Sequence, residues 1–251
     1  MRLFTAHPVF CFWIITMPHF APPHSVATAA SLTRSNQQYA VLARQYDALT
    51  PRLEPLRREA HALLQLRAGD TVMDVGCGTG KSLAALSQAV AIGGHVIAVE
   101  PCAPMIAQAR ERQTQDELVN VQLIEAPIEV VTAHVAPHSV DAFLLMFTHD
   151  VLQSEAAINA LLRVAKPGAR FALTGGKFFR GPLTLLNPWV RWRQQPYCTT
   201  FANYDAPWRR LFATSSMTAT HWQARYGGIA YIAGARLSAQ ATTETKCAAF
   251  T

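Results

Sequence analysis

The fold of this chain is decided by the run Val72-Met73-Asp74-Val75-Gly76-Cys77-Gly78-Thr79-Gly80. Its first part is apolar or β-branched apart from Asp74, which is typical of a buried parallel strand. Three glycines follow at alternate positions, and a stretch that predicts a helix begins at Lys81. Because glycine lacks a Cβ atom, it allows positive φ and lets a ligand approach the backbone closely. The run therefore predicts a strand, a tight turn and a helix that together bind a nucleotide cofactor.

Glycine spacing separates the cofactor motifs that use such a turn. A P-loop has four residues between its first glycine and Gly-Lys-Ser/Thr, whereas only three separate Gly76 from Gly80-Lys81-Ser82. A dinucleotide fingerprint would need its third glycine at Lys81. What remains is a G-x-G-x-G pattern preceded by the acid Asp74. Binding of a nucleoside triphosphate with Mg²⁺ would be needed to restore an NTPase interpretation.

The run from Asp74 to Gly80 resembles the first motif of the class I S-adenosylmethionine-dependent methyltransferases, a superfamily that includes the small-molecule methyltransferases of ubiquinone and menaquinone biosynthesis. The resemblance implies an α/β fold with a Rossmann-like, doubly wound sheet. Seven strands are expected, mostly parallel with an antiparallel C-terminal hairpin, with helices on both faces. It also implies S-adenosyl-L-methionine as the cofactor. The residues of this motif predicted to bind it are Asp74, Gly76, Cys77, Gly78 and Gly80.

A second cofactor element follows the predicted strand His95–Val99, which ends on Glu100. In nucleotide-binding α/β folds an acid about 20 residues beyond the glycine turn accepts ribose hydroxyls. The run from Glu100 to Ile106 resembles the acid-x-x-x-x-Met-Leu run of the same family. By that resemblance Glu100 would hold the ribose, while Pro101 and Met105 would line the adenine.

The ends of the next two predicted strands, 121–124 and 140–147, add further candidates. Where many relatives carry a Gly-Asp-Ala-Glu run, this chain has Pro127, so the backbone around Ile128 is the expected adenine contact. The second of these strands ends at Phe147, followed by Thr148 and His149. In the family this position faces the methyl group and the acceptor.

The remaining elements complete the predicted sheet. A helix is expected over 154–166, capped by Ser154 and stopped by Pro167-Gly168. A fifth strand is expected over 170–174. Segments 217–226 and 229–236 resemble the antiparallel strands that close the family's sheet.

Residues 1–34 are expected to form a leader that is either disordered or mis-started, in which case translation begins at Met17 and residues 1–16 are not part of the protein. The apolar run 9–17 imitates a signal peptide, but prolines flank it and it is too short to span a membrane as a helix. Residues 35–251 are expected to form a single domain. Within it, amphipathic helices at 36–47 and 53–64 would form a lid over 35–66. Tyr46 either belongs to this family's Tyr-Asp cofactor element or packs between lid and sheet.

Composition fits one α/β domain. The chain has 251 residues, half of them hydrophobic, and a formal net charge of +6. Without a dense Lys/Arg run or a known nucleic-acid module, this charge is interpreted as a solvated basic surface, and a nucleic-acid partner is not expected. The five cysteines show neither a disulfide framework nor zinc spacing, so no metal is expected and the cytoplasm is the predicted compartment.

The segment 177–215 is expected to select the substrate. Its aromatic residues alternate with lysine and arginine. Such a mixture suits a pocket for a planar aromatic, anionic or lipid-like small molecule, or peripheral contact with a membrane surface. The alternative is a small aromatic core with a rim of solvated arginines.

The predicted reaction is displacement of the sulfonium methyl group by an acceptor atom. His149 is the candidate general base, because an imidazole with a pKa near 6.5 can remove a proton at neutral pH. A histidine that only packs at this position is the alternative. Two other functions stay open: transfer of the aminocarboxypropyl group from the same cofactor, and a non-catalytic cofactor-binding partner domain.

Overall fold

The computed structural model describes residues 39–239 except 42, 44, 45, 49, 196, 214 and 215. The predicted leader over 1–34 lies outside these residues. Of the first predicted lid helix, residues 39–41, 43, 46 and 47 are described, and all of them are helical. Within the described part of the chain no helix combines the length and the apolar character needed to cross a membrane.

The centre of the fold is one seven-stranded sheet, ordered β3-β2-β1-β4-β5-β7-β6. Pairing is parallel from β3 through β5 and antiparallel between β5 and β7 and between β7 and β6. The predicted fold class is therefore confirmed. The strands are β1 Thr71–Val75, β2 His95–Val99, β3 Val121–Ile124, β4 Val140–Met146, β5 Ala165–Gly176, β6 Met217–Arg225 and β7 Ala230–Leu237.

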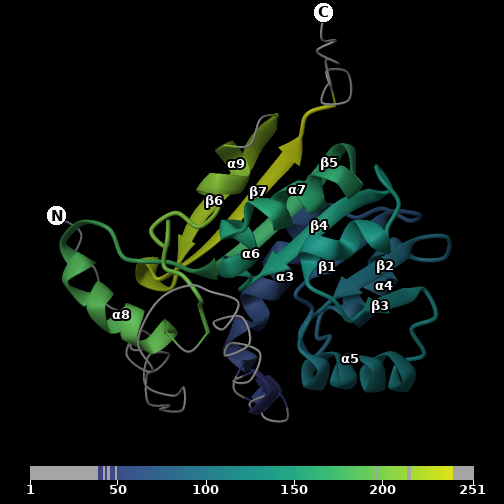
Figure 1. Cartoon of the computed structure of the whole chain (residues 1–251), viewed down its shortest axis with the longest axis horizontal. Helices are drawn as coiled ribbons and strands as arrows, with labels where there is room; N and C mark the ends of the chain where they lie inside the picture. The colour runs from purple at the N-terminus through teal and green to yellow at the C-terminus, as the bar shows by residue number, and fades with distance from the viewer. Residues whose placement is uncertain are drawn as a thin grey trace, which may run out of the picture.

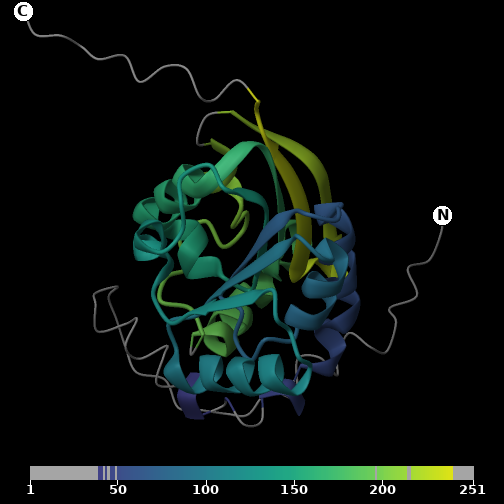
Figure 2. The same cartoon turned by 90° about the vertical axis from the view of Figure 1, so that its right-hand side faces the viewer.

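Helices cover both faces of this sheet, as Figures 1 and 2 show. On one face lie α3 (Glu54–Leu64), α4 (Leu83–Val90) and α5 (Ala103–Gln115), whose apolar sides share one core cluster. On the other face lie η2 (Ile128–Ala133), α6 (His149–Gln153) and α7 (Glu155–Val164). Shorter elements are η1 (Pro51–Leu53), η3 (Gly181–Leu186), α8 (Asn187–Gln194), α9 (Arg209–Ala213) and η4 (Tyr226–Gly228).

Alternation along the strands builds these two cores. Val72 of β1 packs on the α4 side, while Met73 and Val75 pack on the α7 side. On the α7 side the rings of Phe143 and Phe171 stack with centroids 4.5 Å apart. Because both faces of the sheet are covered, the central strands are apolar nearly throughout, which is why the sequence resembled parallel strands.

The helix predicted over 154–166 is two residues shorter at its C-terminus. Ser154 does cap it, accepting a hydrogen bond from the Ala157 amide at 3.2 Å. The helix ends at Val164, and β5 begins at Ala165 instead of the predicted Arg170. The residue before a proline is disfavoured in the α conformation, so Pro167 forces Lys166 out of the helix and the chain enters the sheet early.

The third glycine of the turn is required by packing. Gly80 has φ +81°, and a Cβ added there would lie 2.7 Å from Cδ1 of Leu83 and 3.1 Å from Cα of Ala109. The absence of a side chain at Gly80 therefore allows the turn to pack closely against α5. Gly78 has φ +56°, but a Cβ there would meet no atom within 4 Å. These two glycines serve different purposes.

We expect Gly80→Ala to lower the free energy of unfolding by about 2 to 4 kcal/mol, because backbone strain and overpacking add. Gly78→Ala is the matched control and should cost only about 1 to 2 kcal/mol, from the backbone alone. Urea denaturation of both variants measures the difference. Equal losses would show that the contact with α5 is unimportant.

Candidate functional site

The site lies where the strand order reverses. Strand β1 pairs with β2 on one side and β4 on the other, so the loops leaving β1 and β4 diverge at the same sheet edge. Open α/β sheets bind ligands in the crevice at such a switch point. A cavity, here called the switch-point cavity, opens there between the loops after β1, β2 and β4.

Eight of the thirteen predicted site residues line this cavity. They come from the glycine turn, the loop after β2, the start of α5, the end of β4 and the lid: Tyr46, Gly76, Gly78, Glu100, Pro101, Met105, Phe147 and His149. Residues as far apart in sequence as Tyr46 and His149 are thus brought around one space. Their roles toward a cofactor stay predictions.

Glu100 is held rigidly at the cavity wall. Its carboxylate accepts hydrogen bonds from the backbone amides of Gly78, at 3.0 Å, and Cys102, at 2.9 Å. Burial raises the pKa of this carboxyl, and the two amides oppose that shift. The side chain is only 9% exposed. Together with the space over Gly78, which a Cβ would fill, this arrangement fits a ligand with vicinal hydroxyls beside the turn.

Five predicted residues lie outside the switch-point cavity: Asp74, Cys77, Gly80, Pro127 and Ile128. Pro127 is exposed, and Ile128 packs into the core on the α7 side. Burial raises the pKa of Asp74 to about 7, although Arg57 opposes the shift. The pKa of the Cys77 thiol is also raised by burial, so this thiol stays protonated at neutral pH.

The lid is tied to the glycine turn through Asp47. Its carboxylate accepts hydrogen bonds from the Thr79 hydroxyl at 2.7 Å and from the Arg112 guanidinium at 2.5 Å. The Asp47 carbonyl oxygen accepts from the Lys81 ammonium at 3.3 Å. These bonds hold the preceding residue, Tyr46, over the cavity.

The residues that suggested a P-loop are used for this attachment. Lys81 contacts the lid, and the Ser82 hydroxyl accepts a hydrogen bond from Arg57 of α3 at 3.1 Å. In a P-loop the corresponding lysine and hydroxyl face phosphates and Mg²⁺. Their engagement here argues against the NTPase interpretation.

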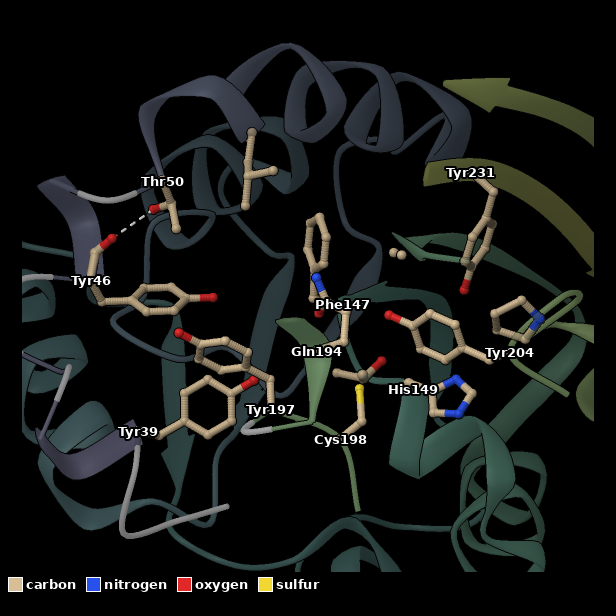
Figure 3. Close-up of a pocket in the computed structure, with 15 residues that line it drawn as sticks. Tyr39, Tyr46, Thr50, Phe147, His149, Gln194, Tyr197, Cys198, Tyr204 and Tyr231 are labelled. Carbon is tan, nitrogen blue, oxygen red and sulfur yellow. Dashed lines mark hydrogen bonds between the residues drawn. The ribbon is translucent and has the colours of Figure 1, made fainter. Parts of the chain in front are cut away.

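A second cavity adjoins the first and is lined mainly by aromatic side chains; we call it the aromatic cavity. Figure 3 shows tyrosines converging on this cavity from the lid, from β7 and from the segment that follows α8. Tyr197 and Tyr204 flank the thiol of Cys198 there. The described residues that line it include no Asp, Glu, Lys or Arg. The two cavities share six lining residues: Tyr39, Tyr46, Phe147, Thr148, His149 and Tyr197.

Most aromatic residues of the segment 177–215 form a small core of their own. Phe179, Val190, Tyr204 and Ile229 are buried together, with Phe178 and Phe201 packed against them. The arginines lie outside it: Arg191 is exposed over the Phe201 ring at 4.9 Å. For these residues the core-and-rim interpretation is correct.

His149 stands at the wall common to both cavities. Its ring lies edge-on to Tyr204, with centroids 4.7 Å apart, and its side chain is 8% exposed (Figure 3). Among the described residues neither ring nitrogen has a hydrogen-bond partner. Burial lowers the pKa of His149 to about 4, with the nearby Thr200 backbone opposing the shift. The expected value near 6.5 is therefore wrong: the imidazole is neutral at pH 7, and as a base it is weaker than expected.

Phe147 forms the turn that leads from the end of β4 to His149. It has φ +59°, a left-handed conformation that non-glycine residues rarely adopt, and its amide donates to the Thr174 carbonyl at 2.7 Å. Such strain commonly occurs at functional sites.

Sequence reasoning missed several lining residues. Asp150 lines the switch-point cavity and accepts from the Thr199 amide at 3.0 Å, which ties α6 to the segment after α8. Its position next to His149 was the available signal. Tyr197 belongs to the segment 177–215, whose aromatic composition was the available signal. Tyr39 and Tyr231 carried no signal, because nothing in their local sequence indicates that they meet Tyr197.

The low pKa of His149 makes stability depend on pH. A folded pKa near 4 lies below the unfolded value of about 6.5, so this stabilisation is present above pH 6.5 and is lost as the pH falls toward 4. Between pH 7 and pH 5 the free energy of unfolding should fall by about 2 kcal/mol through His149.

In His149→Gln, the free energy of unfolding should fall less between pH 7 and pH 5 than in the wild type, because the contribution of His149 is lost. Urea denaturation at both pH values measures this difference. His61, whose pKa burial also lowers to about 4, leaves part of the dependence in place. His95→Gln, at an exposed position in β2, is the control and should behave like the wild type. An unchanged pH dependence in His149→Gln would contradict the assignment.

Comparison with known proteins agrees with this geometry. Residues 72–168 match the family described as "Methyltransferase domain". The chain is 32% identical over 110 residues to demethylmenaquinone methyltransferase of Clavibacter sepedonicus, covering 42% of this chain and 41% of that protein. It is 30% identical over 137 residues to aklanonic acid methyltransferase of Streptomyces sp. (strain C5), covering 53% and 60% respectively. The matches thus span about half the length of these relatives.

The fold matches more completely than the sequence. A SAM-dependent methyltransferase from Aquifex aeolicus aligns with a TM-score of 0.60 and 22% identity, covering 79% of this chain and 98% of that one. The matched segment 72–168 contains the glycine turn, Glu100 and His149. Residues 72–168 thus match a methyltransferase domain, and the chain as a whole shares the fold of a solved SAM-dependent methyltransferase.

Proposed function

We propose that this chain methylates a small, neutral, planar acceptor held in the aromatic cavity, using S-adenosylmethionine bound in the switch-point cavity. The observation that carries the proposal is the pair of adjoining cavities with His149 in their common wall. One cavity has features for a nucleoside, and the other has features for an uncharged ring.

Residues of the switch-point cavity suit the cofactor. Glu100 would accept the ribose hydroxyls with the oxygen lone pairs that its two backbone amides leave open. Gly78 would allow close approach of the backbone, and Pro101 and Met105 would contact the base. When bound, S-adenosylmethionine supplies a methyl group on a good leaving group. Positioning and exclusion of water are then the main tasks of the protein.

Tyrosine side chains that cover both cavities would position the ligands and exclude water. Tyr39 and Tyr46 of the lid lie edge-on, with ring centroids 6.2 Å apart, and Tyr39 packs on Tyr197 at 5.9 Å. These rings close both cavities from the same side. Of the predicted lid over 35–66, we therefore assign the part that precedes α3 to the lid, because α3 packs on the sheet. We assign 177–215 to acceptor selection, within a single domain over 35–251.

The neutrality of the aromatic cavity favours an uncharged acceptor. Its described lining offers tyrosine hydroxyls, Gln194 and Thr50 as hydrogen-bonding groups, and His149 is neutral at pH 7. An anionic acceptor buried there would lack a countercharge, which is costly. Among the relatives' acceptors, demethylmenaquinone fits this requirement better than aklanonic acid. Cys77 and Cys198, which form no disulfide within the described part of the chain, support activity in a reducing cytoplasm.

His149 would assist when the acceptor arrives protonated. As the acceptor atom bonds to the methyl carbon and the carbon–sulfur bond breaks, the acceptor's proton would pass to the unpartnered imidazole nitrogen. Because burial lowers the pKa of His149 to about 4, its imidazole is unprotonated at pH 7 and available to accept this proton, although it is a weaker base than an imidazole in water.

Cofactor binding is tested by calorimetry with S-adenosylhomocysteine. We expect Glu100→Gln to weaken binding by about 10- to 100-fold, because charge-assisted hydrogen bonds to the ribose are lost. Glu125→Gln is the matched control, since Glu125 is exposed at the end of β3 and pairs with Arg110. Folded wild-type protein that binds ATP but not S-adenosylhomocysteine would overturn the proposal.

Acceptor binding is tested by transfer of a labelled methyl group to reduced demethylmenaquinone, with aklanonic acid as the anionic comparison. We expect Cys198→Leu to raise KM for the neutral acceptor about tenfold by filling the aromatic cavity. Affinity for S-adenosylhomocysteine should not change, because Cys198 does not line the switch-point cavity.

Cys198→Ser keeps the size of the side chain and serves as the control. Product analysis separates the alternatives: methylthioadenosine in place of S-adenosylhomocysteine would indicate aminocarboxypropyl transfer. Cofactor binding without turnover of either acceptor would favour the partner-domain interpretation.

A further inference from the structure

The segment formed by η3 and α8 presents apolar side chains to solvent. All six residues of η3, each within the described part of the chain, are exposed. Leu183, Leu185 and Leu186 are 43%, 87% and 42% exposed, and Trp192 of α8 is 42% exposed. We call these four residues the leucine face. Isolated exposed leucines are ordinary, but four large apolar residues within ten positions form a patch that indicates a binding surface.

The leucine face is held in place from behind. Val190 of α8 is buried in the small core with Phe179, and Trp189 packs against that core. The Asn187 side chain makes two hydrogen bonds with the backbone of Phe179. It accepts one from the amide at 2.8 Å and donates one to the carbonyl at 3.1 Å. Figure 1 shows α8 at the edge of the molecule, beyond the end of the sheet. One side of this segment is thus anchored, and the other faces outward.

The surroundings of the leucine face are strongly basic. Between positions 180 and 210 the sequence has five arginines, Arg180, Arg191, Arg193, Arg209 and Arg210, and one acidic residue, Asp205. Arg180 and Arg209 both bond Asp205, at 3.1 and 3.4 Å, and each is 59% exposed. Arg191 is exposed one residue before Trp192. An anionic partner therefore complements this surface.

We propose that the leucine face docks on an anionic phospholipid bilayer. Leucine and tryptophan suit the boundary between headgroups and acyl chains, and neighbouring arginines suit lipid phosphates. A second copy of the chain is a poorer partner, because a two-fold interface would bring like-charged arginine clusters together.

Docking also orients the aromatic cavity. Gln194, the last residue of α8, lines that cavity, and so do Tyr197 and Cys198 just after it. A bilayer on the leucine face would therefore lie beside the wall through which a membrane-dissolved acceptor reaches the site. This consequence rests on the proposed function, whereas the docking itself does not.

The test is co-sedimentation of the full chain with sucrose-loaded vesicles. Wild type should bind vesicles of phosphatidylcholine with phosphatidylglycerol, bind phosphatidylcholine alone much less, and be released by added salt. Leu185→Asp should weaken binding about tenfold, since it places a charge where the side chain meets the acyl boundary. Ile92→Asp is the matched control, because Ile92 is 101% exposed in the turn between α4 and β2, outside η3 and α8.

Two results would overturn the docking proposal. One is failure of wild type to bind the anionic vesicles. The other is equal binding by the Leu185→Asp and Ile92→Asp variants; sedimentation velocity would then show whether the face joins two copies. Calorimetry with S-adenosylhomocysteine on the same samples distinguishes a failed docking surface from a failed cofactor site, and it confirms that both variants are folded.

Discussion

The reversal of strand order at β1 is the constraint on which the rest of the structure depends. Crossovers between parallel strands are right-handed, so a chain that first builds the sheet outward through β2 and β3 must return on the opposite face to add β4. The helices consequently divide between the two faces, and the loops after β1 and β4 separate. Both the glycine turn and His149 border the gap that this separation leaves. The position of the site is thus a result of topology, while its chemistry depends on a few side chains.

Features encoded in local sequence were predictable. Glycines at alternate positions mark a turn with positive φ, and all three of Gly76, Gly78 and Gly80 adopt it. Mostly apolar runs of four to eight residues identified the central parallel strands, because burial on both faces leaves little room for polar residues. The predicted end of α7 was wrong for a local reason too, because Pro167 disfavours the helical conformation at Lys166.

Features that depend on distant contacts were not predictable. The pKa of His149 is set by burial beside Tyr204, 55 positions further along the chain, and no local pattern announces that packing. The attachment of the lid through Asp47 joins it to Thr79 and Arg112, which belong to two other elements. The aromatic cavity likewise requires tyrosines from the lid, the segment after α8 and β7 to meet. The aromatic and basic composition of 177–215 was visible in sequence, but its division into a core and an outer surface was not.

The six residues shared by the two cavities have a consequence for thermodynamics. A molecule in either cavity restrains side chains such as Tyr39 and Tyr197 that also shape the other. The entropy lost in ordering those rings is then borne by whichever ligand binds first, and the second ligand encounters a wall already ordered. Linkage requires this effect to be equal in both directions. If the two proposed ligands occupy these cavities, we expect them to bind cooperatively, without any movement of the sheet.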